Sequence, residues 1–371
     1  MIRANDVLAI IHSNSYDEAL PALTNMRTMG SVPFGGRYRL IDFTLSNLVN
    51  AGIGKVGVLT KSNYQSLMDH LGTGKPWDLS RKRSGLFLLP PFLLGETSTN
   101  DNRIEALKGN MNFISRSSEE YVILADSNVV TNFDVNELMK FHEETNADIS
   151  VVYKKGKTPS LSNIMTFDID ADSRVKAVSV GADEEESNYS LNIFFMKKAL
   201  LERLINEAFA MHKKSMTVDI FQANYATLSI CAMENKNFAV SIDSLDTYYR
   251  ANMMLLDKEN RNCLFNKKRP VYTKVRDDMP ALYAIDSKVK NSLVSDGCEI
   301  KGEVNGSVLG RGVKVEKGAI VKNCVLMQDC FIGAGAHLEN VILDKNVVIK
   351  PGKTLVGADD YPVYVGKRIV I

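Results

Sequence analysis

Apolar runs and helical stretches alternate along the first half of the chain. Apolar runs occupy residues 7–11, 56–59, 121–124 and 149–153, and helical periodicity covers residues 45–51 and 135–145. Asp134 is placed to cap the second helix, and Gly52 to end the first. The alternation predicts an α/β domain with a mostly parallel sheet covered on both faces. Such sheets bind ligands at the carboxyl ends of their strands.

The last part of the chain has a different period. Val308, Val325 and Ile342 recur at equal intervals along the sequence. Three further registers repeat at the same interval: Val315, Ile332 and Ile349; Gly318, Gly335 and Gly352; and Val321, Leu338 and Leu355. Within a coil, apolar positions recur at a shorter interval, as between 315 and 321. This pattern resembles the hexapeptide repeat of a left-handed parallel β-helix, with glycines at corners where φ is positive.

Composition narrows the classes of partner and compartment. The formal net charge of the 371 residues is +1, which favours neither nucleic acid nor an anionic membrane as a partner. The five cysteines form no Cys-x-x-Cys pair, and the apolar run at residues 7–11 is too short for a targeting segment. We therefore expect reduced thiols and a cytoplasmic location.

Several long motifs carry a family resemblance. Residues 32–43, Val-Pro-Phe-Gly-Gly-Arg-Tyr-Arg-Leu-Ile-Asp-Phe, resemble the glucose-1-phosphate adenylyltransferase (ADP-glucose pyrophosphorylase) family, as do residues 45–47, 74–79, 269–274 and 291–298. The resemblance implies a Rossmann-like, GT-A-like nucleotidyltransferase domain. We predict this domain over residues 1–242, a helical and extended linker over 243–285, and the β-helix over 286–371.

The loop after the first strand departs from the family pattern. Family members hold the ATP triphosphate there with a Gly-Gly-x-Gly-Ser/Thr-Arg-Leu loop. The aligned glycines are Asn14, Ser15 and Asp17 here, and the aligned arginine is Ala19. Asp17 and Glu18 would lie where the polyanion sits. Each such repulsion at about 4 Å is worth about 1 kcal/mol in water and about 4 kcal/mol near a protein surface.

Other positions that the family uses for chemistry are also changed. By the resemblance, Met29 replaces a lysine, and residues 102–106 replace a Gly-Thr-Ala-Asp-Ala segment at the nucleobase. Ser127 and Ser241 replace the two aspartates that bind magnesium, with Asp126 one residue early. Because Mg²⁺ prefers carboxylate oxygens, we expect no cofactor, although family enzymes use this ion.

An anionic effector pocket is better preserved. Four basic residues match the pocket of the family: Arg27, Arg39, Lys55 and Lys345. Two further basic positions of the family are Met26 and Asp69 here, so binding would be weak or lost. A purely structural alternative is that Arg37 and Arg39 pair with Asp42.

These changes predict a catalytically silent regulatory or assembly subunit of glucose-1-phosphate adenylyltransferase. The resemblance implies a catalytic companion subunit in glycogen synthesis and a heterotetramer. Val308, Val325 and Ile342 would bury a side as the coils stack, and we expect subunit contacts to cover the flat faces and the open end of the β-helix. One alternative is an active sugar-1-phosphate nucleotidyltransferase with a rearranged loop. A second is a β-helix acyltransferase, which is disfavoured because His337 is the one histidine in the coils.

Overall fold

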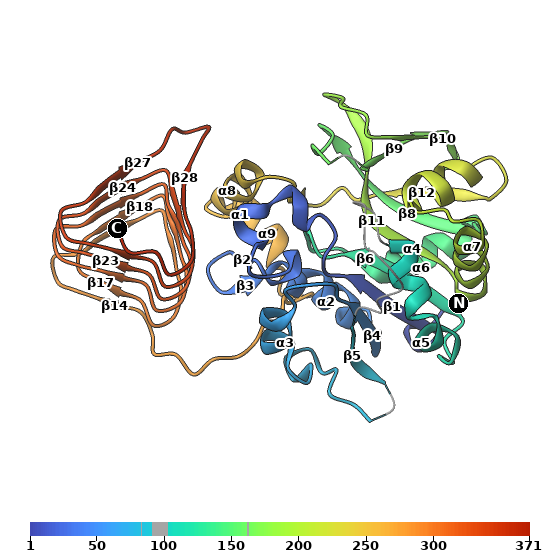
Figure 1. The fold of residues 1–371 in the computed structure, drawn as a ribbon, viewed down its shortest axis with the longest axis horizontal. Helices are drawn as coiled ribbons and strands as arrows, with labels where there is room; N and C mark the ends of the chain where they lie inside the picture. The colour runs from blue at the N-terminus through green and yellow to red at the C-terminus, as the bar shows by residue number, and fades with distance from the viewer. Residues whose placement is uncertain (83, 91–102, 162) are drawn as a thin grey trace.

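The computed structural model describes the chain except residues 83, 91–102 and 162. A sheet domain and a triangular β-helix lie side by side, with α8 (Leu245–Met254) and α9 (Lys258–Leu264) between them (Figure 1). The α/β sheet domain and the left-handed parallel β-helix confirm the predicted fold class. No helix of the described ranges combines the length and apolar character needed to cross a membrane.

The central sheet contains nine strands in the order β10-β9-β11-β6-β1-β4-β5, and β8 joins β11 and β12. Their bounds are β1 (Val7–His12), β4 (Lys55–Leu59), β5 (Gly85–Leu89), β6 (Tyr121–Asp126), β8 (Ile149–Gly156), β9 (Met165–Ile169), β10 (Val175–Val180), β11 (Ser187–Lys197) and β12 (Ile230–Glu234). β1 pairs in parallel with β4 and β6, whereas β11 runs antiparallel to β6 and β8. The mostly parallel sheet is thus confirmed.

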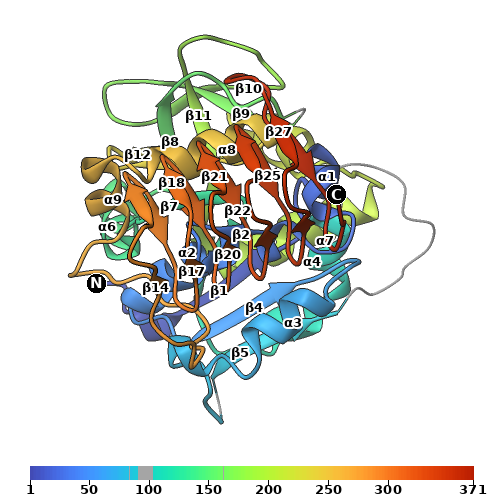
Figure 2. The same ribbon diagram turned by 90° about the vertical axis from the view of Figure 1, so that its left-hand side faces the viewer.

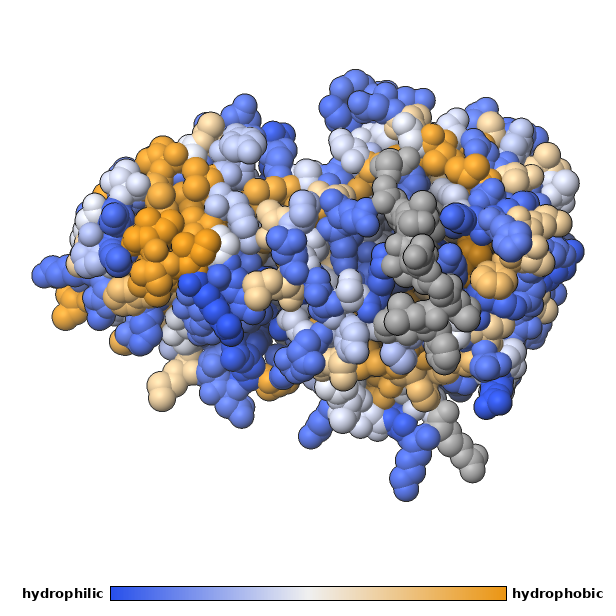
Figure 3. Space-filling view, in the orientation of Figure 1, coloured by the Kyte–Doolittle hydropathy of each residue, from blue (hydrophilic) through white to orange (hydrophobic). Residues whose placement is uncertain are grey.

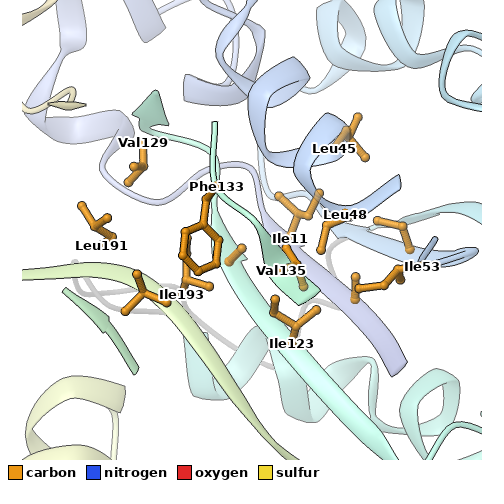
Figure 4. Packing of buried hydrophobic residues seen from close by; sticks show 14 of the residues in the cluster. Ile11, Leu45, Leu48, Ile53, Ile123, Val129, Phe133, Val135, Leu191 and Ile193 are labelled. Atoms are coloured by element: carbon orange, nitrogen blue, oxygen red, sulfur yellow. The ribbon is translucent and has the colours of Figure 1, made fainter. Parts of the chain in front are cut away.

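Helices cover both faces of this sheet. They are α1 (Pro21–Thr24), α2 (Leu40–Asn50), α3 (Gln65–Leu71), α4 (Arg103–Gly109), α5 (Met111–Ser115), α6 (Val135–Thr145) and α7 (Lys198–Ala210). Successive residues of β1 pack into cores on opposite faces of the sheet, because side chains alternate along a strand. Ile11 lies in one core with Leu45 and Leu48 of α2 (Figure 4). Ile10 lies in the other core, with Leu107 of α4.

Both predicted helix ends are confirmed, but one helix starts earlier than predicted. Gly52 follows the end of α2 with a φ of 87°, and its N–H donates to the carbonyl of Val49 at 2.9 Å. The Asp134 side chain accepts a hydrogen bond from the backbone N–H of Asn136, 3.0 Å away, and so caps α6 as predicted. α2 begins at Leu40 and not at residue 45, because Asp42 Oδ2 accepts the backbone N–H of Arg39 at 2.9 Å. This hydrogen bond satisfies a donor at the start of the helix.

Short elements complete the sheet domain. They are η1 (Ala4–Asp6), η2 (Asp17–Ala19), η3 (Met29–Ser31), η4 (Lys75–Trp77), the π-helix η5 (Thr217–Gln222), the paired strands β2 (Pro33–Phe34) and β3 (Tyr38–Arg39), and the paired strands β7 (Val129–Thr131) and β13 (Ala239–Ser241).

Three parallel sheets form the β-helix, and its coils lie side by side (Figure 2). The first contains β14 (Leu282–Tyr283), β17 (Glu299–Ile300), β20 (Lys314–Val315), β23 (Phe331–Ile332) and β26 (Val348–Ile349). The second contains β15 (Lys288–Lys290), β18 (Glu303–Asn305), β21 (Ile320–Lys322), β24 (His337–Glu339) and β27 (Thr354–Val356). The third contains β16 (Leu293–Val294), β19 (Val308–Leu309), β22 (Val325–Leu326), β25 (Val341–Leu343) and β28 (Val363–Val365). β14 therefore begins inside the range 243–285 that we assigned to the linker.

The register of the coils follows the repeat in the sequence. Val308 pairs with Val325, and Val325 with Ile342. The coil that joins Leu293 to its partner Val308 is shorter than this repeat, and the coil that joins Ile342 to its partner Tyr364 is longer. Gly318, Gly335 and Gly352 all have positive φ, as expected for corners.

The outer surface of the third sheet corrects one expectation. Val325 and Ile342 pack with Tyr248 of α8 and Phe34 in a core shared by the two parts of the chain. The interior of the β-helix is filled instead by the residues that follow them, such as Leu326 and Leu343. The expectation that stacking of the coils alone buries Val325 and Ile342 is therefore wrong, because the chain's own sheet domain covers this face.

Candidate functional site

A cavity of about 480 Å³ lies at the carboxyl ends of β1 and β4. Its walls are residues 12–19, residues 59–62, Arg103 and Ala106 of α4, and the segment of Ser160, Leu161 and Asn163. Parallel strands of such a sheet end at this edge, where ligands bind in α/β folds. The altered loop thus forms one wall of the cavity, as its place in the sequence predicted.

Side chains hold the loop in its conformation. The amide nitrogen of Asn14 donates to Asp17 Oδ2 at 2.6 Å and to the carbonyl of Ser62 at 3.2 Å, while its oxygen accepts the N–H of Lys61 at 2.8 Å. Tyr16 has a left-handed backbone with φ of 66°, which is unusual for a residue other than glycine. Polar side chains therefore fix the loop where family members have glycines.

The two carboxylates of the loop have different surroundings. Glu18 is exposed at the rim, whereas Asp17 is turned inward and accepts the backbone N–H of Met29 at 2.7 Å. Burial raises the pKa of Asp17 to about 7, against the opposing effect of its hydrogen bonds. Ala19 packs at the edge of the core, and Met29 is fully buried, so neither brings positive charge to the cavity.

A buried ion pair lies at the inner end of the cavity. The guanidinium of Arg103 contacts the carboxylate of Asp126, the last residue of β6 and the register partner of His12, and both side chains are almost fully buried. Arg103 also lies over the ring of Tyr16, 5.4 Å from its centroid, and donates to the Tyr16 hydroxyl at 3.1 Å. The amide of Asn192 donates to the same hydroxyl at 2.9 Å. The aromatic ring and the ion pair therefore form one connected cluster.

The residues at the aligned metal positions do not fit Mg²⁺. Ser127 is fully buried, and its hydroxyl donates to the carbonyl of Ser13 at 3.3 Å. Ser241 is buried in β13, opposite Val129 of β7. Asp126, directly before Ser127, binds Arg103 and accepts the Ser15 hydroxyl at 3.1 Å, and Asp243, two residues after Ser241, accepts the backbone N–H of Ser160 at 2.7 Å. A hard divalent cation would need these oxygens free of a guanidinium.

Three of the four predicted anion-binding residues come together between the two parts of the chain. Arg27 is buried, and its Nη2 donates to both carboxylate oxygens of Asp344, at 2.7 and 2.5 Å. Arg39 donates to the carbonyl and hydroxyl of Ser66 at 2.6 and 2.9 Å. Burial, with the nearby Arg39 and Arg27, lowers the pKa of Lys345 to about 7. No ion pair of Lys345 or Arg39 occurs among the described residues.

Lys55 lies elsewhere. It is the first residue of β4, so it lies at the end of that strand opposite the cavity. Its ammonium pairs with the carboxylate of Glu119 at 3.2 Å. The alternative, in which the Arg39 guanidinium pairs with Asp42, is wrong. The guanidinium donates to Ser66, and Asp42 Oδ1 lies 2.6 Å from His70 Nε2. Arg37 is 3.9 Å from Asp296.

Sequence reasoning missed several residues of both clusters. Arg103 belongs to the segment 102–106, in which we considered only the loss of the small residues of the family. Asn102 of this segment lies outside the described residues. An arginine at a nucleobase position was the available signal. Lys367 belongs to the interface cluster, since Arg27 and Arg39 both help to lower its pKa. The adjacent Lys367 and Arg368 were a weak signal for it.

Comparisons with known proteins extend over both parts of the chain. The nucleotidyl transferase family model matches residues 18–223, and the model of a GlmU-like, C-terminal hexapeptide matches residues 282–362. Glycogen biosynthesis protein GlgD of Bacillus subtilis is 35% identical over 99% of this chain and 97% of its own. GlgD of Geobacillus stearothermophilus is 36% identical over 85% and 83%, and glucose-1-phosphate adenylyltransferase of Thermosipho africanus is 33% identical over 85% and 78%.

Proposed function

Because this chain belongs to the glucose-1-phosphate adenylyltransferase family of nucleotidyl transferases, we propose that it serves glycogen biosynthesis as a catalytically silent regulatory or assembly subunit. In this role it modulates the synthesis of ADP-glucose from ATP and glucose-1-phosphate by a catalytic companion subunit, in a heterotetramer. Its relatives with the GlgD name support the pathway. The five free cysteines support a reducing, cytoplasmic location.

The Arg103–Asp126 ion pair carries this proposal. Nucleotidyl transfer needs positive charge where pyrophosphate leaves, and a metal ion held by free carboxylates. Here the buried carboxylate and the buried guanidinium at the inner end of the cavity neutralise each other. Glu18 at the rim adds negative charge on the side from which a polyanion would enter. The cavity therefore has none of the charge balance that transfer requires.

The interface cluster supports a regulatory role. Arg39 of the sheet domain and Lys345 of the β-helix lie in this cluster, where burial, and after it the charge of Arg39, lowers the pKa of Lys345 to about 7. A phosphate or sulfate group of a small-molecule effector would be held there by charge-assisted hydrogen bonds. Its binding would bias how the two parts of the chain meet.

Subunit assembly would use surfaces that the sheet domain leaves uncovered. The β-helix shows an apolar patch on the face seen in Figure 3. The last coil has exposed apolar side chains at Val356, Ile369 and Val370. An open end of stacked coils requires cover, because its last strands have unpaired edges and apolar surface. We propose that a companion subunit supplies that cover.

Kinetics on three samples test the proposed function: this chain alone, a catalytic subunit alone, and the two co-purified. We expect negligible ADP-glucose from this chain alone and a changed saturation curve or effector response in the mixture. A variant with Asn14, Ser15 and Asp17 changed to Gly and Ala19 to Arg should remain inactive, because the metal ligands are still absent. A chain that fails to bind a catalytic subunit, or binds without kinetic effect, would contradict the regulatory role.

One observation favours the alternative of an active transferase. The cavity of about 480 Å³ persists although the glycine loop does not. Clear turnover by the pure chain with ATP, Mg²⁺ and glucose-1-phosphate would establish that alternative and remove the proposal above.

A further inference from the structure

Three hydroxyl groups on the wall of the cavity use their hydrogens within the chain. The hydroxyls of Ser13, Ser15 and Thr60 donate to protein oxygens, at 2.7, 3.1 and 3.1 Å. Each hydroxyl can donate only one hydrogen, so what remains on these three oxygens is lone pairs. A ligand that only accepts hydrogen bonds, as a phosphoryl group does, would find no donor in these three hydroxyls.

Two further polar atoms have no hydrogen-bond partner in the described residues. They are His12 Nε2 and Asn163 Oδ1, and His12 as a whole is 6% exposed. Burial lowers the pKa of His12 to about 3, so its imidazole is neutral and carries one hydrogen. His12 Nδ1 lies 3.9 Å from Asp126 Oδ1, beyond hydrogen-bond distance, so this hydrogen can occupy either ring nitrogen. A ligand hydroxyl can pair with Nε2 in either form and can donate to Asn163 Oδ1.

The cations of the wall have acidic neighbours. Arg103 is paired with Asp126, and Lys61 is near enough to Asp17 to oppose the rise of its pKa. With Glu18 exposed at the rim, no surplus of positive charge remains for a phosphate. Apolar surface comes from Leu161 and Ala106.

We propose that this cavity binds an uncharged, ring-containing ligand rich in O–H or N–H donors, either a free sugar or a nucleoside without phosphate. A volume of about 480 Å³ lies within the range of about 300–1,000 Å³ typical of small-molecule sites. The inference rests on the proposed function, because it gives a ligand class to the site that has lost transfer chemistry.

Calorimetric titration of the isolated full chain with two matched pairs tests the inference: glucose against glucose-1-phosphate, and adenosine against ATP. In at least one pair we expect the unphosphorylated member to bind at least about tenfold more tightly. The pair that shows this preference identifies the source of the ligand as sugar or nucleoside. Tighter binding of the phosphorylated member in both pairs, or no binding of any probe at millimolar concentration, overturns it.

Two variants locate the binding. Ala106→Trp should fill the cavity and abolish binding, whereas Ala210→Trp, at the exposed end of α7, should leave it unchanged. His12→Phe keeps a buried ring of similar size and removes the polar Nε2, so we expect a loss of at least about fivefold even if Ala106→Trp folds poorly. Unchanged affinity in His12→Phe would contradict the assignment. Co-purification with a catalytic subunit is a separate measurement, so the failure of this inference and of the proposed function can be told apart.

Discussion

Two basic clusters of this chain differ in how their charge is balanced. In the cavity, Arg103 is paired with the buried carboxylate of Asp126 and stacked on Tyr16. At the contact with the β-helix, Arg27 is paired with Asp344, but Lys345 lies beside Arg27 and Arg39 with its pKa lowered to about 7. One cluster is neutral within the chain, and the other holds excess positive charge.

The difference indicates where an external anion can still bind. A buried cation without a partner is disfavoured by desolvation and by its neighbours, and an anion that pairs with it relieves both effects. A cation that already has a buried carboxylate gains little from a second one. We therefore propose that the cavity gains little from an external phosphate, because Asp126 already pairs with Arg103, whereas the interface cluster can still gain from an external anion.

Removal of the guanidinium in the cavity should have the largest effect. We expect Arg103→Ala to lower the free energy of unfolding by about 3–5 kcal/mol, because Asp126 would be left as a buried, unpaired charge. The double variant Arg103→Ala, Asp126→Ala should recover part of this loss. Urea unfolding at neutral pH measures both. Arg250→Ala, which removes an exposed pair with Asp246, serves as control, with a change of at most about 0.5 kcal/mol.

A loss at Arg103 no larger than in this control would contradict the comparison. It would mean that water reaches Asp126 and that the cavity is not neutralised from within.

At the interface cluster, the main effect should be on anion affinity. Arg39→Ala should weaken binding of sulfate or phosphate by about 10- to 100-fold, as expected for the loss of a charge-assisted hydrogen bond of about 1.5–3 kcal/mol. Anion-dependent thermal stabilisation gives the affinity, since a ligand of the folded state raises the unfolding temperature. Lys55→Gln is the matched control, because Lys55 lies at the far end of β4 and pairs with Glu119. Equal weakening in both variants would show that the anion does not bind at this cluster.

The pH dependence of anion binding should follow Lys345. Its pKa is about 7 without the anion, and a bound anion raises it by favouring the charged form. Affinity should therefore be greatest below pH 7 and fall above it, by at most about tenfold per pH unit, until the pKa of the bound form is reached. Lys345→Arg should flatten this profile, because arginine stays protonated. If the anion affinity of the wild-type chain did not change between pH 6 and pH 9, the role of Lys345 would be contradicted.

The sequence predicted the β-helix well and its surroundings less well. A repeat of constant length reports coil stacking directly, and Val308, Val325 and Ile342 do pair in register. It does not report which face of a rung points outward, because neighbouring positions such as Val325 and Leu326 are both apolar. Only the packing of Tyr248 on the outer face distinguishes them.

At the site, alignment revealed what was lost but not what replaced it. Ser127 and Ser241 stand where the family has metal ligands, and this could be read from single positions. The Arg103–Asp126 pair joins α4 to the end of β6, so it depends on how separate elements meet in space. The place of Lys367 in the interface cluster likewise depends on the fold, which brings the last coil close to Arg27 and Arg39.

The smallest effect should come from the hydroxyl of Tyr16. This oxygen accepts hydrogen bonds from Arg103 and Asn192, and Tyr16→Phe removes both while the ring stays beneath the guanidinium. We expect a loss of about 1 kcal/mol in the free energy of unfolding, because Arg103 keeps its carboxylate partner. Tyr361→Phe, at a side chain that is 80% exposed, should change nothing and serves as control. If Tyr16→Phe cost as much as Arg103→Ala, the hydroxyl and not the ion pair would hold the cluster together, and the charge comparison between the two clusters would lose its basis.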